Sequence, residues 1–345
     1  MDGLTEQTAA DWLRTRGWLA ASVGAEVRML EWGVSNVVLR VTPDTGADFI
    51  VKQSRPQLRT PIPWFSRIDR IYREADALRV IRTVVPAGTV PEVLWEDRPE
   101  YVFAMEAAAD PHTVWKQELL AGRLDREVAG QLGDWLGQMH RKTAGQPGLR
   151  EQFGDLEVFQ QLRVDPFYRR VAAAHPDLAT HWTSLIEGAL SHPVCLVHGD
   201  FSPKNVLLVG RQLFLVDFET VHYGDPAFDT GFFLSHLLLK TLHHHARFAE
   251  MAELGIAFWA GYQSQLRRQP VPEELDPGRV VSRTLPHLSG CMLARVDGTS
   301  RVDYLPAAGQ QQAVRDFCRA LLLDPPPDWA GVLQSLRESA RRHMV

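Results

Sequence analysis

Hydrophobic positions alternate along the first hundred residues in a way that predicts β-strands. Residues 27–51 contain β-branched clusters separated by turn residues, and residues 49–52 form the last of these runs. Apolar residues then recur at helical spacing over residues 68–81, and two more alternating runs follow at 90–95 and 101–105. The order of three strands, a helix and two strands predicts a small sheet with one packed helix.

The pattern becomes mainly helical after about residue 109. Residues 119–139 have the period of one long amphipathic helix, and residues 159–190 also favour helix. Short apolar runs predict three strands, at 194–197, 205–209 and 213–216. We therefore expect an α+β chain with two lobes, 1–108 holding the sheet and 109–345 being mainly helical.

Composition and charge narrow the class of protein. The 345 residues are 45% hydrophobic and 23% charged, which is typical of a globular chain long enough for two lobes. The net charge of -5 offers no basic excess for nucleic acid or an anionic membrane surface. Three widely spaced cysteines indicate a reducing compartment rather than a disulfide framework or a zinc site. Without a signal-peptide pattern or an apolar run of about 18 residues, we expect a soluble cytoplasmic protein.

The segment from His198 to Asn205 holds the most informative chemistry. Asp200 and Asn205 lie five residues apart in it, on a predicted loop between two buried strands. Asp217 follows twelve residues after Asn205, at the end of the next predicted hairpin. Because a hairpin brings the ends of its strands to one edge, Asn205 and Asp217 would lie side by side as hard oxygen ligands that suit Mg²⁺. Asp200 is left nearby to orient a hydroxyl, and phosphoryl transfer needs little more than positioning and charge neutralisation.

Three motifs follow one another in this part of the chain. They are His-Gly-Asp-x-x-x-x-Asn at 198–205, Asp-Phe-Glu at 217–219 and Tyr-Gly-Asp-Pro-x-Phe-Asp at 223–229. In this order and spacing the chain resembles the aminoglycoside phosphotransferase and choline kinase family of small-molecule kinases, over about residues 31–304. The resemblance implies a two-lobed protein-kinase-like α+β fold, with a small antiparallel-sheet N-lobe and a mainly helical C-lobe. It also implies ATP and Mg²⁺ as cofactors and a small-molecule hydroxyl as the acceptor.

The resemblance implies roles for residues around the three motifs. Asp200 would be the catalytic base, and Asn205 and Asp217 would hold Mg²⁺. Glu219 would be a further or water-mediated ligand, with a hydrogen-bonding structural role as the alternative. Two more residues are predicted to be structural and to fix the catalytic loop: His198 and Asp229.

In the small lobe the resemblance implies a nucleotide site. Lys52, at the end of the third strand, would reach the α- and β-phosphates, and Glu74 would pair with it from the helix. Residues 33–36 would form the nucleotide loop, and the backbone near residues 106–108 would hydrogen-bond adenine. The nucleotide-binding residues that we expect are therefore Gly33, Ser35, Asn36, Lys52, Glu74, Glu106 and Ala108.

A narrower set of features resembles the 5-methylthioribose kinase branch. It comprises Trp64 with Asp69-Arg70 and Glu74-Ala75, Gly33-x-x-Asn36, Tyr223-Gly224 with Phe228-Asp229-x-Gly231, and Arg295-x-x-Gly298. Arg295 lies where that branch carries a paired-arginine motif, with Ala294 in place of the first arginine. Arg295 and Asp297 are predicted either to contact the substrate or to form a buried salt bridge.

Charge gives one indication of the acceptor. From residue 240 onward there are 13 Lys and Arg against 11 Asp and Glu, so the acidic bias that cationic aminoglycosides need does not appear. This favours a neutral or anionic sugar-like acceptor, with an aminoglycoside O-phosphotransferase as the alternative.

A protein Ser/Thr kinase is disfavoured because the base motif is His-Gly-Asp and few residues follow Asp217 for an activation loop. A non-catalytic nucleotide-binding protein is disfavoured because every expected catalytic residue is present. We expect no nucleic-acid or membrane partner, and no oligomeric state is indicated.

Overall fold

The computed structural model describes residues 3–30, 35–60, 63–268 and 271–344. The chain forms two compact units, the first being Met1–Thr113 with Leu207–Thr220 and the second Val114–Val206 with Val221–Val345. One unit built on a sheet and one built on helices confirm the predicted α+β class. The division at residue 108 stays a prediction, and the compact units differ from it because residues 207–220 pack with the sheet.

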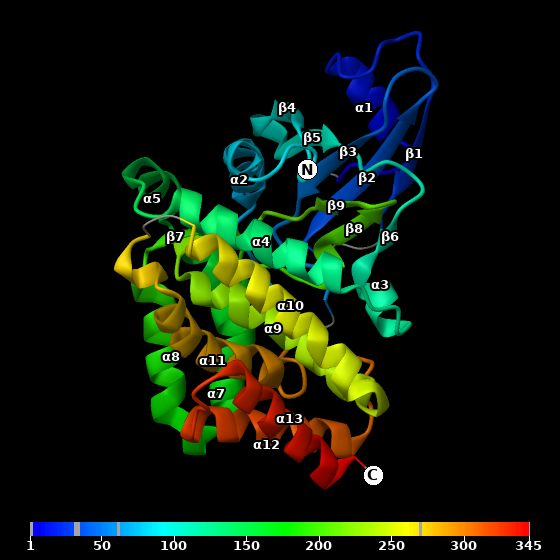
Figure 1. Ribbon diagram of the computed structural model, residues 1–345. Helices are drawn as coiled ribbons and strands as arrows, with labels where there is room; N and C mark the ends of the chain where they lie inside the picture. Colours follow the sequence, from blue (N-terminus) through cyan, green and yellow to red (C-terminus); the bar gives the residue numbers. More distant parts are fainter. Residues whose placement is uncertain (1–2, 31–34, 61–62, 269–270, 345) are drawn as a thin grey trace. The chain divides into compact units, whose positions relative to one another are not determined.

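The first unit is built on a five-stranded antiparallel sheet with the strand order β1-β2-β3-β5-β4 (Figure 1). Its strands are β1 (Ala25–Met29), β2 (Asn36–Pro43), β3 (Phe49–Ser54), β4 (Val93–Asp97) and β5 (Val102–Glu106). Helix α2 (Arg70–Val84) comes between β3 and β4 in the chain. This is the order of elements that the hydrophobic pattern predicted.

The two faces of this sheet are covered by different helices. Val37, Leu39 and Val41 of β2 belong to a buried apolar cluster that includes residues of α1 (Ala9–Thr15). Because successive side chains of a strand point to opposite faces, the alternate residues of the sheet point away from this cluster. Lys52 follows a cluster member, Val51, in β3 and is therefore directed to the opposite face, where it meets α2.

Residues 207–220 add a hairpin to the first unit. Its strands are β8 (Val206–Val209) and β9 (Gln212–Leu215), and the turn between them contains Gly210 with φ 58°, a conformation that favours glycine. The main-chain N–H of Leu215 donates to the carbonyl of Thr89 at 2.8 Å. The hairpin thereby carries the Asp-Phe-Glu motif that follows it into the sheet unit.

The second unit is organised around α9 (Pro226–His243), which is buried along nearly its whole length. Asp225 accepts a hydrogen bond from the N–H of Ala227, and Pro226 occupies the first helical position, so the helix start is well determined. Besides short 3-10 helices, the other described helices and strands are β6 (Thr113–Val114), α3 (Trp115–Leu120), α4 (Arg126–Thr143), α5 (Pro147–Phe153), α6 (Glu157–Phe159), the π-helical η2 (Gln160–Arg169), α7 (Arg170–Ala174), α8 (Ala179–Ser191), β7 (Cys195–Val197), β10 (His222–Gly224), α10 (Phe248–Leu266), α11 (Pro277–Ala294), α12 (Ala308–Leu323) and α13 (Trp329–His343).

The helix predicted over residues 119–139 is two helices, α3 and α4. Gly122 follows α3 with φ 73°, a left-handed conformation that stops a helix. The side chain of Asp125 then accepts from the N–H groups of Glu127 and Val128 and caps the start of α4. The apolar period continues across the break, which is why the hydrophobic pattern alone predicted a single helix.

Two further predictions from the sequence concern membrane-spanning helices and disulfide bonds. In the part of the chain that the structure describes, no helix combines the length and the apolar character needed to cross a bilayer. The three cysteines, Cys195, Cys291 and Cys318, are buried and form no disulfide. Burial raises the pKa of each of these thiols, so we expect them to stay protonated and unreactive.

Candidate active site

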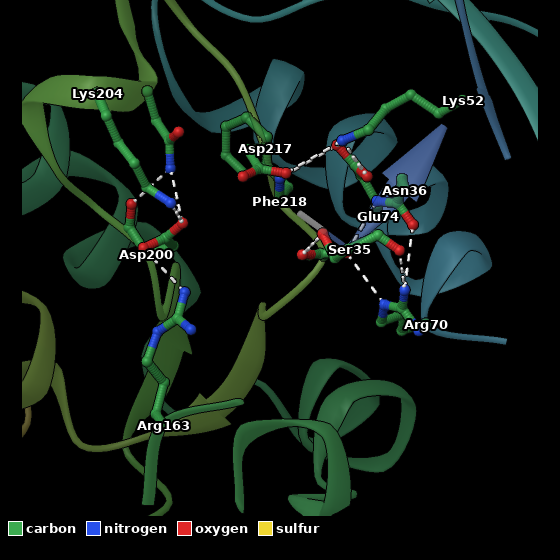
Figure 2. A network of polar contacts seen from close by, with 12 residues as sticks. Ser35, Asn36, Lys52, Arg70, Glu74, Arg163, Asp200, Lys204, Asp217 and Phe218 are labelled. Atoms are coloured by element: carbon green, nitrogen blue, oxygen red, sulfur yellow. Dashed lines mark hydrogen bonds and ion pairs between the residues drawn. The ribbon is translucent and has the colours of Figure 1, made fainter. Parts of the chain in front are cut away.

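The first unit brings Lys52, Glu74 and Asp217 together (Figure 2). The Nζ atom of Lys52 donates to both carboxylate oxygens of Glu74, at 2.7 and 2.8 Å, and to Oδ1 of Asp217 at 3.1 Å. Glu74 is fully buried and Lys52 is 4% exposed. The pair between β3 and α2 that the resemblance implied is thus formed, and Asp217 joins it.

This group holds more negative than positive charge. Burial lowers the pKa of Lys52, but the carboxylates of Glu74, Asp217 and Glu219 overcome this effect and raise it above its usual value. Burial raises the pKa of Glu74, and Asp217 and Glu219 act in the same direction while Lys52 opposes them. Arg70 supplies the second positive charge, through its contact with Glu219. A further cation would relieve the remaining excess of negative charge.

The backbone of Asp217 is in the left-handed region, with φ 73°. This conformation costs an L-residue about 1–2 kcal/mol, although Asp and Asn tolerate it better than most. The next N–H in the chain, of Phe218, donates to Oε1 of Glu74 at 3.3 Å. Strained backbone is found preferentially at functional positions, and Asp217 is the residue predicted to hold Mg²⁺.

Glu219 holds the described part of the predicted nucleotide loop. Its carboxylate accepts from the Ser35 hydroxyl at 2.5 Å, from Nδ2 of Asn36 at 2.9 Å and from Nε of Arg70 at 3.1 Å. Arg70 also donates to the carbonyl of Ser35 at 2.5 Å. Protein donors engage both oxygens of Glu219, which supports the structural alternative for this residue. Gly33 lies outside the described residues.

The predicted hinge has two main-chain groups already engaged. The N–H of Glu106 donates to the carbonyl of Glu92 at 2.8 Å, and the carbonyl of Ala108 accepts from Nη1 of Arg40 at 3.2 Å. Arg40 is itself buried. Adenine would therefore have to use other main-chain groups of residues 106–108, and this contact stays a prediction.

In the second unit Asp200 is the centre of a compact network (Figure 2). Nη2 of Arg163 lies 2.8 Å from Oδ1 of Asp200, and Nζ of Lys204 lies 2.8 Å from Oδ2. Asn205, the last residue of the short helix η4 (Pro203–Asn205), donates through Nδ2 to Oδ2 at 2.9 Å. Burial alone would raise the pKa of Asp200, but the charges of Arg163 and Lys204 hold it well below its usual range. The carboxylate is thus ionised and suited to accept a hydrogen bond from a hydroxyl.

The predicted magnesium ligands come from both units. Asn205 belongs to the second unit, whereas Asp217 and Glu219 belong to the first. In the chain as described, no cluster of three or more His, Cys, Asp or Glu side chains is arranged to hold a metal ion. Asn205 donates through Nδ2 to the carbonyl and to Oδ2 of Asp200, so Oδ1 is the atom of this side chain that would ligate a metal. Hard oxygens are the ligands that Mg²⁺ prefers, so the chemistry of these donors suits the metal, and the shared site stays a prediction.

Asp229, in the first turn of α9, fixes the backbone of the catalytic loop. Its carboxylate accepts from the N–H of His198 at 2.6 Å and from that of Gly199 at 2.9 Å, and it lies 3.2 Å from Nε2 of His140. Nδ1 of His198 in turn accepts from the N–H of Asp200 at 3.2 Å. These contacts support the structural roles predicted for Asp229 and His198.

Arg163 was not predicted from the sequence. It lies in η2, and its Nε donates to the carbonyl of Gly199 at 2.6 Å while Nη2 pairs with Asp200. No motif surrounds it. The one available signal is a charged residue between two apolar neighbours, Leu162 and Val164, in a segment that is otherwise packed.

The two predicted substrate residues have separate partners among the described residues. Nη1 of Arg295 donates to the carbonyl and the hydroxyl of Ser300 at 3.1 and 2.5 Å, and Nη2 lies 3.3 Å from Nε2 of His236. Asp297 instead accepts from Nη2 of Arg315 at 2.7 Å and lies 2.8 Å from Nε2 of His175. Asp297 is therefore already neutralised, whereas Arg295 contacts no carboxylate there.

Comparisons of sequence place the chain among known proteins. It is 29% identical over 235 residues to methylthioribose kinase from Pectobacterium carotovorum, a match that covers 60% of this chain and 58% of that relative. Methylthioribose kinase from Citrobacter koseri is 27% identical over 264 residues, which cover 68% of this chain and 66% of that relative. The chain thus spans less than two thirds of the length of these relatives.

Two solved structures share the fold. Choline kinase from Cryptosporidium parvum matches with a TM-score of 0.52 at 12% identity, covering 98% of this chain and 96% of the other. A mutant of aminoglycoside 2′-phosphotransferase IIIa in complex with GDP matches with a TM-score of 0.50 at 14% identity, covering 98% of both chains. These likenesses confirm the predicted kinase-like fold. Since residues 26–277 match the family model as well, the chain belongs to the phosphotransferase enzyme family.

Proposed function

We propose that this chain is an ATP- and Mg²⁺-dependent kinase that transfers the γ-phosphoryl group to a hydroxyl of a small, sugar-like molecule. The proposal depends above all on Asp200, a buried and ionised carboxylate fixed by Arg163, Lys204 and Asn205. Membership of the phosphotransferase family supports the reaction class. Similarity to methylthioribose kinases supports a sugar-like acceptor.

Asp200 would orient the acceptor hydroxyl by accepting its hydrogen bond. As the hydroxyl oxygen bonds to the γ-phosphorus, the bond to the oxygen bridging the β- and γ-phosphates breaks and ADP leaves. The hydroxyl proton passes to Asp200. A strongly acidic carboxylate is adequate here because the transition state is loose and the proton is transferred late.

The sheet unit would supply the nucleotide contacts. Lys52, fixed by Glu74, would contact the α- and β-phosphates. Asn205 and Asp217 would hold Mg²⁺, which when bound neutralises charge on the β- and γ-phosphates. Glu219 would keep Ser35 and Asn36 in place beside the nucleotide.

An ADP-release assay tests this function directly. The protein is incubated with Mg·ATP and pools of sugars, amino alcohols and aminoglycosides, and each active pool is resolved into single compounds. We expect turnover that requires Mg²⁺ and is highest with a sugar-like acceptor. If only aminoglycosides are turned over efficiently, the acceptor is an aminoglycoside and not a sugar-like molecule. If no pool raises ADP release above the rate with water, the kinase proposal is wrong.

A further inference from the structure

A basic cluster lies in the second unit next to the catalytic loop. It consists of Lys116, Arg163, Lys204, Lys240 and Arg295, from α3, η2, η4, α9 and the end of α11. Figure 2 shows two of these residues, Arg163 and Lys204, against Asp200. The charge of Asp200 acts on Arg295, and that of the exposed Asp303 acts on Lys116. Among the described residues, the cluster thus gathers five basic side chains next to the catalytic loop.

Lys240 is the most unusual member. Its side chain is fully buried, and its Nζ donates to the carbonyl of His236, one turn earlier in α9, at 3.2 Å. The same atom lies 5.3 Å from the ring centroid of Tyr304. Among the residues that the structure describes, no carboxylate oxygen lies within 4.0 Å of it. A buried ammonium without a counter-charge is costly for the folded protein, so its presence indicates a task other than stability.

Two neighbouring donors are also unsatisfied. Nε of Arg295 and the hydroxyl of Tyr304 are buried, and neither has a hydrogen-bond partner in the described part of the chain. Buried polar atoms normally have one, and each exception asks for an explanation. An ammonium, a guanidinium N–H and a phenol hydroxyl are the donors that typically bind a phosphate or a carboxylate.

The members of the cluster repel one another. Burial, together with the charges of Lys116 and Arg295, lowers the pKa of Lys240 to about 7. Burial likewise lowers the pKa of Lys116, where Arg295 and Lys204 add to the effect and Asp303 opposes it. An anion among these side chains would relieve both the burial cost and the repulsion.

The cluster is connected to the catalytic base through shared aromatic rings. Arg163, which pairs with Asp200, lies 5.8 and 5.5 Å from the ring centroids of Phe167 and Phe232. Arg295 lies 4.9 and 5.7 Å from the same two rings. A molecule that presents its hydroxyl to Asp200 would therefore have strong positive charge next to it.

We infer that the acceptor carries, besides the hydroxyl that is phosphorylated, an anionic group, phosphate or carboxylate, that the basic cluster binds. The inference rests on the proposed kinase function and narrows its acceptor class to sugar phosphates, sugar acids and related hydroxy acids. It also gives a reason for Lys240, which is buried at a cost to stability although no described carboxylate pairs with it.

Matched pairs of acceptors test the inference. The ADP-release assay is run with ribose and ribose 5-phosphate, which test phosphate, and with glucose and gluconate, which test carboxylate. We expect kcat/KM to be at least about tenfold higher for the anionic member of one pair, because a charge-assisted contact in a buried site contributes that much. If the neutral member is the better substrate in both pairs, the inference is wrong.

The variant Lys240→Met tests whether the basic cluster causes the preference for the anionic acceptor. Methionine keeps the length of the side chain and removes its charge, so we expect a folded protein with a higher unfolding temperature than the wild type. The preference for the anionic acceptor should fall about tenfold or more while the KM for ATP stays within about twofold. Lys142→Met, at an exposed position of α4, removes the same charge elsewhere and should leave the preference intact. If Lys240→Met does not fold, Lys116→Met takes its place; a variant that keeps the full preference contradicts the assignment.

Calorimetry with ribose 5-phosphate and with inorganic phosphate separates this inference from the kinase proposal. Binding is measured without ATP, so it does not depend on turnover. We expect the wild type to bind at least one of the two anions and Lys240→Met to bind it about tenfold more weakly. Absence of binding by the wild type, or equal binding by the variant, overturns the inference. Binding that depends on Lys240 in a protein without ATP turnover would support the anion site and refute the kinase proposal alone.

Discussion

At the scale of single residues, the state of Asp200 decides what it can do. Two cations contact its carboxylate and hold its pKa well below the usual range, so it is a weak base. A weak base contributes mainly by orienting the attacking hydroxyl and by receiving the proton once the new bond is largely formed. This role of Asp200 suits phosphoryl transfer, where positioning supplies most of the catalysis.

Replacing Asp200 by Asn keeps the shape of the side chain and removes its charge. We expect kcat to fall roughly 10²–10⁴-fold, because the hydroxyl is no longer oriented by an acceptor that can take its proton. Asp165→Asn, at a half-exposed position of η2, is the matched control and should keep wild-type kcat. Steady-state ADP release with the best acceptor measures both. Near-normal turnover in Asp200→Asn would remove this residue from the mechanism.

Residues within one motif were predictable, whereas their distant partners were not. Asp200 and Asn205 are close in the sequence, so a short loop must bring them together, and the contact between them is observed. Arg70 pairs with Glu219, which follows it by 149 residues. An arginine forms such a pair through tertiary packing, for which a single sequence contains no local signal. Arg163 was missed for the same reason.

At the scale of elements, the contact between α4 and α10 depends on glycine. A Cβ atom added at Gly133 would lie 2.0 Å from the carbonyl oxygen of Phe258, and one at Gly137 would lie 2.8 Å from that of Tyr262. The two helices therefore approach backbone to backbone. The contact has a functional consequence because α4 also carries His140, which contacts the Asp229 carboxylate that fixes the catalytic loop.

Gly133→Ala should therefore destabilise the protein, while Gly130→Ala on the same helix should not. At Gly133 the clash with a carbonyl forces the helices apart, at a net cost of about 1–3 kcal/mol. At Gly130 the nearest atom to the added Cβ is 3.8 Å away, so better helix propensity gives up to about 1 kcal/mol of stabilisation. Urea unfolding followed by circular dichroism compares the midpoints. Equal midpoints for the two variants would show that the helices can separate without cost.

The break between α3 and α4 shows where the element pattern misleads. Hydrophobic periodicity indicates which face of a segment is buried. The apolar period continues from α3 into α4, so it gives no sign of the break. The conformation at Gly122 and the cap at Asp125 end one helix and begin the next. Gly122 and the capping Asp125 could be recognised in the sequence, but such local signals are weaker evidence than an uninterrupted hydrophobic period.

At the scale of the whole molecule, the predicted chemistry is divided between the two units. The sheet unit holds Lys52, Glu74 and Asp217, and the helical unit holds Asp200 and the basic cluster. The α+β class and the order of elements were predictable, because strand and helix periods differ. That residues 207–220 belong to the sheet unit was not predictable, because it depends on contacts such as that of Glu219 with Asn36 rather than on position in the chain.

This division predicts that nucleotide binding and the chemical step can be lost separately. Asp217→Asn removes a charged magnesium ligand and suits the left-handed backbone at φ 73°, which Asn tolerates and Ala does not. We expect this variant to bind a non-hydrolysable ATP analogue with an affinity that Mg²⁺ no longer increases, because the bridging ion loses its carboxylate. Asp200→Asn is the matched control, since Asp200 is not a predicted metal ligand, and its Mg²⁺-dependent binding should equal that of the wild type. Calorimetry with and without Mg²⁺ measures all three proteins. If Asp217→Asn keeps the full effect of Mg²⁺, the metal is held by other residues; if Asp200→Asn loses it, Asp200 is also needed to hold the metal, directly or through Asn205.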